Sequence, residues 1–450
     1  MKKFILISVL IALSACNTGS KTVKKEVKST YKPISDTVLE TATIYEVNIR
    51  QYSSKGTFNA FTKDIPQLKK FGVDILWIMP IYPISVKDRK GTLGSYYAIQ
   101  NYTKVNPNFG SLDDVKKLVK TAHNNGMYVI FDWVANHTGR DHVWLKEHPD
   151  FYVRDSSGKP VAPFDWTDVA KLNYNNPAMR KAMIHDMKYW IDTANIDGFR
   201  CDVAGNVPTD FWENAVAQLK KVKPIFMLAE AEKPELLHEA FDMQYGWQAY
   251  HIFNNIAQGK ATVKAWDTYM EKNNKNLQPD DIDMMFTSNH DENSWNGTVK
   301  ERLGNAAQVL AALTYAAKGM PLIYNGQEYG LNHRLKFFEK DSIPHTKGAW
   351  YELYSKLNGL KAKYKALNGG KEAGSYIRLK TSKDKAILAF KRYKDKNSVF
   401  FTANLTNKAQ SFKLNLTGNF KDALNKKVVV IDKDKIINYK PWEYHFLVKK

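Results

Sequence analysis

Short apolar runs alternate with longer amphipathic stretches from about Thr43 to Glu328. The longer stretches place apolar residues at helical spacing and predict helices, for example over residues 112–124, 179–195 and 305–318. The apolar runs predict eight strands, at residues 43–49, 75–79, 128–132, 198–202, 225–229, 241–243, 284–287 and 322–324. Eight alternating strands and helices favour a closed (β/α)8 barrel, the TIM barrel, over an open doubly wound sheet.

Two regions depart from this rhythm. Residues 139–176 are rich in Trp, His, Asp and Pro and show no clear helical pattern, so we expect an excursion inserted after the third strand. Beyond residue 368 the pattern changes to short alternating segments separated by turn signals such as Asn368-Gly369-Gly370. The sequence therefore predicts that the (β/α)8 barrel spans residues 41–368 and that a C-terminal all-β sandwich spans residues 369–450.

The first residues have the pattern of an export signal. A basic start is followed by an apolar stretch that is too short to span a bilayer and by Leu13-Ser14-Ala15-Cys16. This ending resembles a bacterial lipobox, which implies a signal peptide over residues 1–15, lipidation of Cys16 and an exported lipoprotein anchored on a periplasmic or cell-surface membrane face. The alternative is a plain signal peptide with an incidental cysteine. Residues 16–40 are polar and lysine-rich at first and predict a flexible tether.

Composition adds few constraints. The formal net charge of the 450 residues is +20, but the lysines are dispersed along the chain, so we expect a solvated surface and no nucleic-acid partner. The second cysteine, Cys201, lies in a predicted strand, and because Cys16 would carry lipid we expect no disulfide. Side chains alternate along a strand, so Cys201 should point away from the side of Asp202 and pack in the core.

Three carboxylates follow predicted strands: Asp202, Glu230 and Asp291. A parallel barrel brings the carboxyl ends of its strands to one mouth, so these side chains should meet there. Several acids at one mouth suit glycosidic bond cleavage, which passes through an oxocarbenium-like state. The sequence therefore predicts a carbohydrate-processing site.

Motifs around these acids resemble those of the α-amylase family of glycoside hydrolases (family thirteen). They occur in the expected order and cover nearly the whole barrel: Asp132-Trp133-Val134-Ala135-Asn136-His137, Gly198-Phe199-Arg200-Cys201-Asp202, Glu230 and Asn289-His290-Asp291, with weaker matches at Lys171-Leu172-Asn173 and in residues 95–102 and 106–111. Each motif alone would be weak evidence, whereas all of them in order are strong evidence.

The resemblance implies roles for individual residues. Asp202 would be the nucleophile, Glu230 the general acid/base, and Asp291 the group that stabilises the transition state. Tyr97 would stack on the sugar in the cleavage subsite, with the adjacent Tyr96 as the alternative for this role. Glu232 is the corresponding alternative to Glu230 as the general acid/base.

The resemblance also implies that His137 and His290 contact sugar hydroxyls. Arg200 lies two residues before Asp202 and hence on the same strand face, so we expect it to keep Asp202 ionised. Glu230 has no such neighbour in sequence, and crowding by the other acids should raise its pKa, which suits a proton donor.

Two departures from the family pattern limit the prediction. Gly205 and Asn206 stand where many relatives carry Lys-His, which leaves specificity on the leaving-group side open. Asn136 matches a family calcium ligand, but Asp165 and Asp168 lack clear ligand spacing, so a structural calcium stays an open possibility. No cofactor is required for the chemistry.

The resulting hypothesis is a retaining α-glycosidase that acts on α-1,4-glucans such as starch and maltooligosaccharides. A glucanotransferase or sugar isomerase would use the same covalent intermediate and is the first alternative. A non-catalytic sugar-binding barrel is a remote alternative, because the chain keeps all three acids. The expected partners are the glucan and the membrane that holds the lipid on Cys16.

Overall fold

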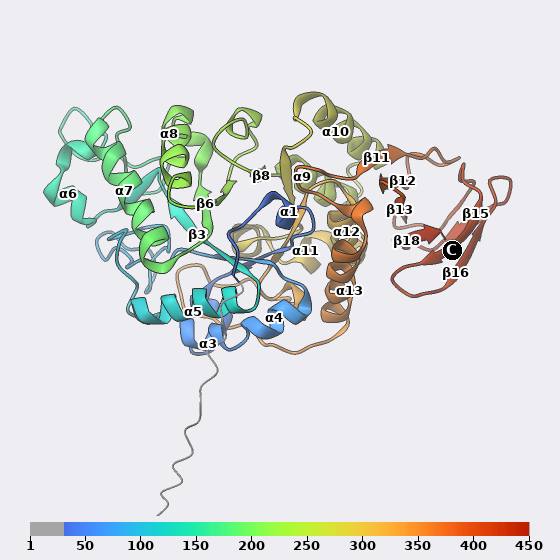
Figure 1. Ribbon diagram of the computed structural model, residues 1–450, viewed down its shortest axis with the longest axis horizontal. Coiled ribbons are helices and arrows are strands. Elements are labelled where there is room, and N and C mark those ends of the chain that lie inside the picture. The colour runs from blue at the N-terminus through green and yellow to red at the C-terminus, as the bar shows by residue number, and fades with distance from the viewer. Residues whose placement is uncertain (1–30, 450) are drawn as a thin grey trace, which may run out of the picture.

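The computed structural model describes residues 31–449. The predicted signal peptide, Cys16 and the start of the predicted tether lie outside the described residues. Eight parallel strands close a barrel in the order β1-β10-β9-β8-β7-β6-β3-β2 (Figure 1). The prediction of a (β/α)8 barrel is confirmed, and the strands are β1 (Ile44–Val47), β2 (Ile75–Ile78), β3 (Tyr128–Val134), β6 (Gly198–Asp202), β7 (Phe226–Ala229), β8 (Met243–Tyr245), β9 (Ile282–Met285) and β10 (Met320–Tyr324).

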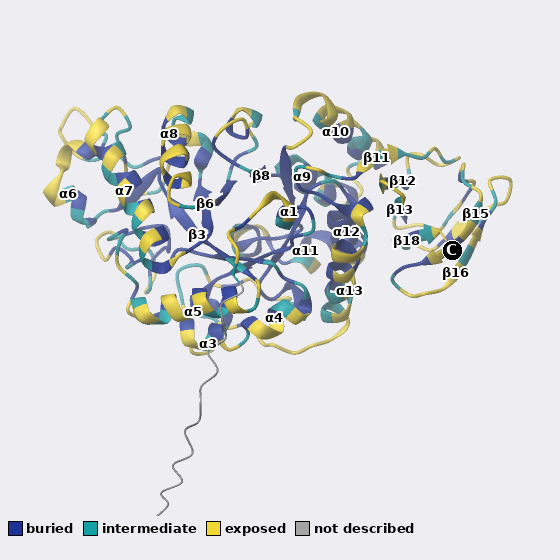
Figure 2. Cartoon of the chain, in the orientation of Figure 1, coloured by how far each residue is buried: buried dark blue, intermediate teal, exposed yellow. Residues whose placement is uncertain are grey.

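Helices cover the outside of the barrel, with one face of each helix buried and the other exposed (Figure 2). Their starts follow from local sequence: Ser111 and Asp114 form a reciprocal capping box at the start of α5. Asn176 caps α7, whose first residue is a proline. The larger helices are α4 (Ile65–Phe71), α5 (Leu112–Asn124), α7 (Pro177–Ala194), α8 (Thr209–Lys220), α9 (Trp247–Ala257), α10 (Val263–Asn276), α12 (Ala307–Ala316) and α13 (Ala349–Lys363). The shorter ones are α1 (Asp36–Leu39), α2 (Ile49–Tyr52), α3 (Phe58–Thr62), α6 (Val143–Glu147) and α11 (Val299–Leu303).

The segment just before the barrel closes its amino-terminal end. Ile34 and Leu39 are buried in the apolar cluster that fills the barrel interior. The hydroxyl of Tyr31 donates a hydrogen bond of 2.6 Å to Asp197, which directly precedes β6. The predicted tether extends to residue 40, and in its described part Ile34 and Leu39 are buried against the barrel, whereas residues 32–33 and 35–37 are exposed. Within residues 31–449, no helix combines the length and the apolarity needed to cross a bilayer.

The excursion after β3 folds over the barrel mouth. Strand β4 (His137–Gly139) pairs antiparallel with β5 (Val169–Lys171), and the chain between them contains the short helix α6. The sequence had indicated no helix there. The pairing of β4 with β5 holds both ends of the excursion beside the strand that carries the first family motif, so its side chains can reach the mouth.

The C-terminal domain is all-β, as predicted, and its strands are antiparallel, but its two sheets are unequal. One has the order β11-β12-β13-β18-β15-β16 and the other contains only β14 and β17. The strands are β11 (Ser375–Arg378), β12 (Ile387–Lys394), β13 (Asn397–Asn404), β14 (Gln410–Phe412), β15 (Gly418–Asp422), β16 (Val428–Ile431), β17 (Ile437–Tyr439) and β18 (Tyr444–Lys449).

A buried arginine joins this domain to the barrel. Arg392 of β12 is fully buried and donates to the carbonyl oxygens of Ala316, Asn368 and Gly374 at 2.8, 2.7 and 3.0 Å. These carbonyls belong to the end of α12 and to the connecting loop, so the domain is fixed beside α12 and α13 (Figure 1).

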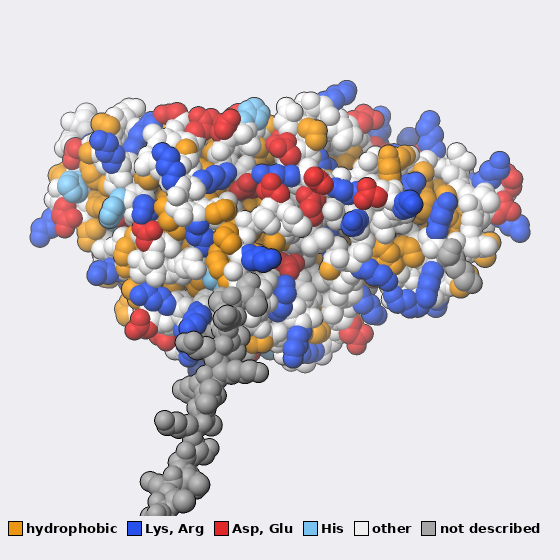
Figure 3. Space-filling model, viewed as in Figure 1, with side chains coloured by type: hydrophobic (Ala, Val, Ile, Leu, Met, Phe, Trp, Pro, Cys, Tyr) orange, Lys and Arg blue, Asp and Glu red, His pale blue; other side chains and the backbone are white. Residues whose placement is uncertain are grey.

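Charged side chains are spread over the surface. On the face shown in Figure 3, Lys and Arg are interspersed with Asp and Glu over the barrel. Oppositely charged neighbours reduce the field of the basic residues on this face. The expected lack of a nucleic-acid partner stays a prediction.

A glycine in the barrel wall gives the first testable prediction. A Cβ on Gly198, whose φ is +147°, would lie 1.8 Å from the carbonyl oxygen of Phe226 on the neighbouring strand. Gly198→Ala should therefore lower the free energy of unfolding in urea by at least about 3 kcal/mol. Gly359→Ala is the control, because Gly359 is exposed within α13 with nothing near its Cβ position, and it should stabilise by about 0.5–1 kcal/mol. Equal effects of the two substitutions would contradict the β6–β7 contact.

Candidate active site

The three predicted carboxylates line one cleft at the carboxyl end of the barrel. Asp202 is the last residue of β6, Glu230 directly follows β7, and Asp291 lies in the loop after β9. The cleft has a volume of about 460 Å³. Its other lining residues are Lys90, Ser95, Tyr97, His137, Trp166, Asp168, Val169, Val203, Trp295, Phe337 and Phe338.

Arg200 lies beneath the carboxylates and is completely buried. Its Nη1 donates to Asp132 Oδ1 at 2.8 Å and to Asp202 Oδ1 at 3.1 Å. Its Nη2 lies 2.8 Å from Glu230 Oε2, within ion-pair distance. The sequence places Arg200 beside Asp202 and gives Glu230 no cationic neighbour in sequence. In the structure Arg200 also reaches Glu230, because β3, β6 and the end of β7 bring three acids to one guanidinium.

Asp202 and Glu230 therefore titrate as a pair. Burial raises the pKa of Asp202, the charge of Glu230 raises it further, and Arg200 opposes both. Burial also raises the pKa of Glu230, and Arg200 again lowers it. The expected rise for Glu230 is confirmed in direction, but Arg200 does not depress the pKa of Asp202 below its ordinary value. Two carboxyls that share one cation retain a proton between them to a higher pH than isolated carboxyls would.

His290 is held as a cation. Its Nδ1 lies 2.5 Å from Glu46 Oε1, and its Nε2 lies 2.7 Å from the hydroxyl of Tyr97 and 3.4 Å from Asp291 Oδ2. Burial alone would lower the pKa of His290, but the charges of Asp291 and Glu46 outweigh it and raise the pKa to about 9. The Tyr97 hydroxyl donates to Asp132 Oδ2 at 3.1 Å and so accepts from the protonated Nε2.

His137, the first residue of β4, is neutral. Burial lowers the pKa of His137 to about 3. Asn136 Nδ2 lies 3.2 Å from His137 Nδ1. Because an amide nitrogen only donates, Nδ1 accepts this hydrogen bond and the proton of the neutral ring is on Nε2. The ring also packs edge-on against Trp166, with centroids 5.4 Å apart. Of the two predicted histidines, His137 lines the cleft and is neutral, whereas the cationic His290 lies behind Tyr97, to which its ring is hydrogen-bonded.

The structure separates the predicted residues from their sequence competitors. Tyr97 lines the cleft, whereas Tyr96 is buried in the core with its ring against a buried arginine. Glu230 lines the cleft, whereas Glu232 accepts the backbone N–H of Gln248 at the start of α9. Cys201 packs in the core on the opposite side of β6, as alternation predicted.

Several site residues were missed in the sequence. Glu46 in β1 partners His290, and its only signal was a lone charge in an apolar run. Lys90 Nζ lies 3.2 Å from Asp168 Oδ1 of the excursion, and both residues line the cleft. Trp295 and Phe337 add an aromatic wall with ring centroids 5.1 Å apart. No spacing in the sequence links these residues, because only the folded chain brings them together.

The residues considered as calcium ligands have protein partners in the structure. Asp168 pairs with Lys90, and the Asn136 amide contacts His137. Over the part of the chain that the structure describes, no group of three or more His, Cys, Asp or Glu side chains is placed to hold a metal ion. Calcium also accepts Asn and backbone carbonyl oxygens, so a structural calcium stays a prediction.

Comparison with known proteins places this geometry in a family. The chain matches the family described as "Alpha amylase, catalytic domain" over residues 35–169 and 162–404, most of its length. The chain belongs to the α-amylase family. It is therefore a glycoside hydrolase of the α-amylase type.

Individual relatives agree with this assignment. Alpha-amylase 3 of Dictyoglomus thermophilum is 25% identical over 482 residues, which cover 88% of this chain and 91% of the relative. Alpha-amylase MalA of Haloarcula japonica is 26% identical over 309 residues, but the match covers only 45% of MalA and 66% of this chain. The structure of the maltogenic α-amylase AmyB of Thermotoga neapolitana superposes with a TM-score of 0.84 at 30% identity, covering 91% of this chain and 98% of AmyB.

The charge on His290 predicts a pH-dependent stability in this α-amylase family member. The folded pKa of His290 is about 9 and lies above its unfolded value near 6.5, so its contribution is complete below about pH 6.5 and is lost as pH rises through 9. The free energy of unfolding should differ between wild type and His290→Gln by about 3 kcal/mol more at pH 6 than at pH 10.

Urea unfolding at the two pH values measures this difference. Lys361, whose pKa burial lowers to about 7, shifts stability in the opposite direction but does so in both proteins, so the comparison cancels its effect. A wild-type advantage that does not change between pH 6 and pH 10 would mean that His290 is neutral in the folded protein.

Proposed function

We propose that the protein is a retaining α-glycosidase that hydrolyses α-1,4-linked glucans through a covalent glycosyl–enzyme intermediate. The observation that carries the proposal is the pair of carboxyls, Asp202 and Glu230, linked by Arg200 at the cleft, with Asp291 lining the same cleft. Such a pair can hold one ionised and one protonated carboxyl at the same time, which the retaining mechanism requires.

In the first step, ionised Asp202 attacks the anomeric carbon and Glu230 donates its proton to the glycosidic oxygen. The bond to the leaving sugar breaks and a glycosyl ester of Asp202 forms. In the second step, Glu230 takes a proton from water, the hydroxide oxygen bonds to the anomeric carbon, and Asp202 leaves as a carboxylate. The N–H of Val203 donates to Oε2 of Glu230, and Arg200 forms its ion pair with the same oxygen, so Oε1 is the oxygen that can carry the transferred proton.

Neighbouring groups stabilise the positive charge that develops on the sugar. Asp291 supplies a negative charge beside the cationic His290, which fixes its position. The Nε2–H of His137 can donate to a sugar hydroxyl, while the Tyr97 ring, stacked on His290, offers an apolar surface to the cleft. Contacts that tighten only in the transition state increase the rate rather than the affinity for substrate.

The shape of the cleft supports a glucan substrate. Trp166, Trp295 and Phe337 line it, and aromatic faces of this kind pack against the apolar faces of sugar rings. The Thermotoga relative is named a maltogenic α-amylase. On the leaving-group side, Lys233 reaches back and donates to the carbonyl of Gly205 at 2.7 Å, so a lysine borders the position at which many relatives carry Lys-His.

We also propose export and lipid anchoring at Cys16, for which the lipobox-like sequence is the support. Residues 34 and 39 are buried at the amino-terminal end of the barrel, opposite the cleft. An anchor that joins the chain there would turn the cleft away from the membrane and toward polymeric substrate. Cys16→Ser should release the protein from the membrane fraction and abolish labelling with palmitate, and unchanged labelling would contradict the proposal.

Removal of the proposed nucleophile tests the mechanism. Asp202→Asn should lower kcat on soluble starch and maltoheptaose by about 10³-fold or more, because no glycosyl ester can form. Glu232→Gln is the matched control: it removes a carboxyl only two residues from Glu230 but outside the cleft, and activity should be retained. Proton NMR of the first product should show the α-anomer; an initial β-anomer would exclude retention.

A substrate panel separates hydrolysis from glycosyl transfer. Starch, pullulan, cyclodextrins, trehalose and sucrose should be incubated separately and the products resolved by chromatography. Shorter maltooligosaccharides from starch support the proposed hydrolase. Longer oligosaccharides or rearranged disaccharides as the main products would instead identify a transferase or isomerase that uses the same intermediate.

A further inference from the structure

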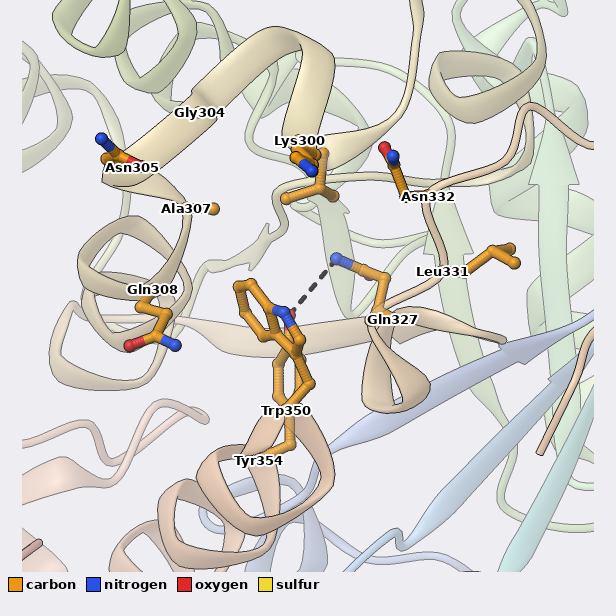
Figure 4. A pocket seen from close by; sticks show the side chains of 12 residues that line it. Lys300, Gly304, Asn305, Ala307, Gln308, Gln327, Leu331, Asn332, Trp350 and Tyr354 are labelled. Carbon is orange, nitrogen blue, oxygen red and sulfur yellow. Dashed lines mark hydrogen bonds between the residues drawn. The ribbon is translucent and has the colours of Figure 1, made fainter. Parts of the chain in front are cut away.

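A second pocket, larger than the catalytic cleft, lies on the outer layer of the barrel (Figure 4). It has a volume of about 650 Å³ and is formed by α11, the starts of α12 and α13, and the loop after β10. None of its lining residues lines the catalytic cleft. The proposed hydrolysis does not use it.

The lining has the chemistry of a sugar site. The indole ring of Trp350 faces an opening bordered by the amide side chains of Asn305, Gln308 and Asn332 (Figure 4). Lys300 is the one charged residue that lines the pocket, and it is exposed at the rim. Amides supply both donors and acceptors, and an aromatic face supplies an apolar platform, so the lining suits a neutral polyhydroxylated ring.

The aromatic platform is built into the fold. Trp350 stacks on Tyr354 one helical turn further along α13, with ring centroids 6.0 Å apart. Gly330 lies under the indole, where a Cβ would come within 2.5 Å of Trp350 Cδ1. Buried Gln327 donates to the Tyr354 hydroxyl at 3.3 Å and to Thr287 Oγ1 at 2.9 Å. The indole is therefore held in place before any ligand binds.

The pocket and the catalytic cleft share a wall. The two segments between them, residues 292–299 and 331–338, carry Trp295 and Phe337 toward the cleft and Val299 and Asn332 toward the pocket. The hydroxyl of Thr298 donates to the Asn332 side chain at 2.8 Å and joins the two segments. The same two segments therefore line both the catalytic cleft and the pocket.

A further hollow extends the pocket toward the C-terminal domain. It has a volume of about 300 Å³, shares Gln308 with the pocket, and continues past Lys356 of α13 to Tyr444 of β18. The two hollows are neighbours on α13, where Trp350 lines the pocket and Ala349 the hollow, so a ligand with several sugar rings can contact both.

We propose that this pocket, centred on Trp350, is a second binding site for an α-glucan chain, one that holds polymer while the cleft cleaves it. The choice of an α-glucan rests on the proposed function, whereas the neutral sugar class follows from the lining alone. The site would raise the effective concentration of polymer at the cleft. It would not change the turnover of substrates too short to reach from the cleft to the pocket.

Affinity electrophoresis in gels containing soluble starch tests binding without turnover in the Asp202→Asn background. Trp350→Ala should weaken starch binding by about fivefold. Because Trp350 is half-buried, the double variant Asn305→Ala/Gln308→Ala provides a second test at exposed positions and should also weaken binding. Asn419→Ala, an exposed asparagine on β15 outside both hollows, is the control and should bind as the parent does.

Kinetics with an intact Asp202 complete the test. Both pocket variants should lower kcat/KM on starch by a similar factor and leave kcat/KM on maltotriose unchanged. Unchanged starch binding in both variants would overturn the second site while leaving the hydrolase intact. Trp350-dependent binding of starch by a protein that cleaves no α-glucan would instead support the site and refute the proposed function.

Discussion

The site depends on one buried cation, Arg200, which contacts Asp132, Asp202 and Glu230. A buried charge without partners is costly, and so is a buried cluster of acids without a cation. The guanidinium and the three acids compensate one another's charge only if β3, β6 and β7 keep their register. The register pairs Arg200 with Asp132 and with Leu228, so the barrel that positions the acids is the same structure that neutralises them.

This arrangement explains how two carboxyls can have different protonation states beside the same cation. One positive charge cannot fully compensate three acids, so burial keeps a proton on the Asp202–Glu230 pair. A second cation, His290, is stabilised nearby by Glu46 and Asp291. Arg200 and His290 are connected through Asp132 and the Tyr97 hydroxyl, so a change in one part of the network alters the charge balance of the rest.

Much of this could be predicted from the sequence, because strand alternation and barrel topology are local or repetitive properties. Apolar runs located all eight strands, and Asp202, Glu230 and Asp291 were expected at the mouth because each follows a run. The sequence could not show that Arg200 also contacts Glu230, since strand spacing indicates neighbours only within one strand. Lys90 and Phe337 lie on loops and Trp295 on the short helical turn Glu292–Asn296, and their convergence exists only in the folded chain.

The most direct test of the central claim is to trap the covalent intermediate. A Glu230→Gln variant incubated with a 5-fluoro α-glucosyl fluoride should form the ester, because fluoride needs little acid assistance, and should hydrolyse it slowly, because the general base is gone. Mass spectrometry of proteolytic peptides should find one glucosyl adduct on the peptide that contains Asp202. An adduct on the peptide of Asp291, or steady fluoride release without any adduct, would contradict the account.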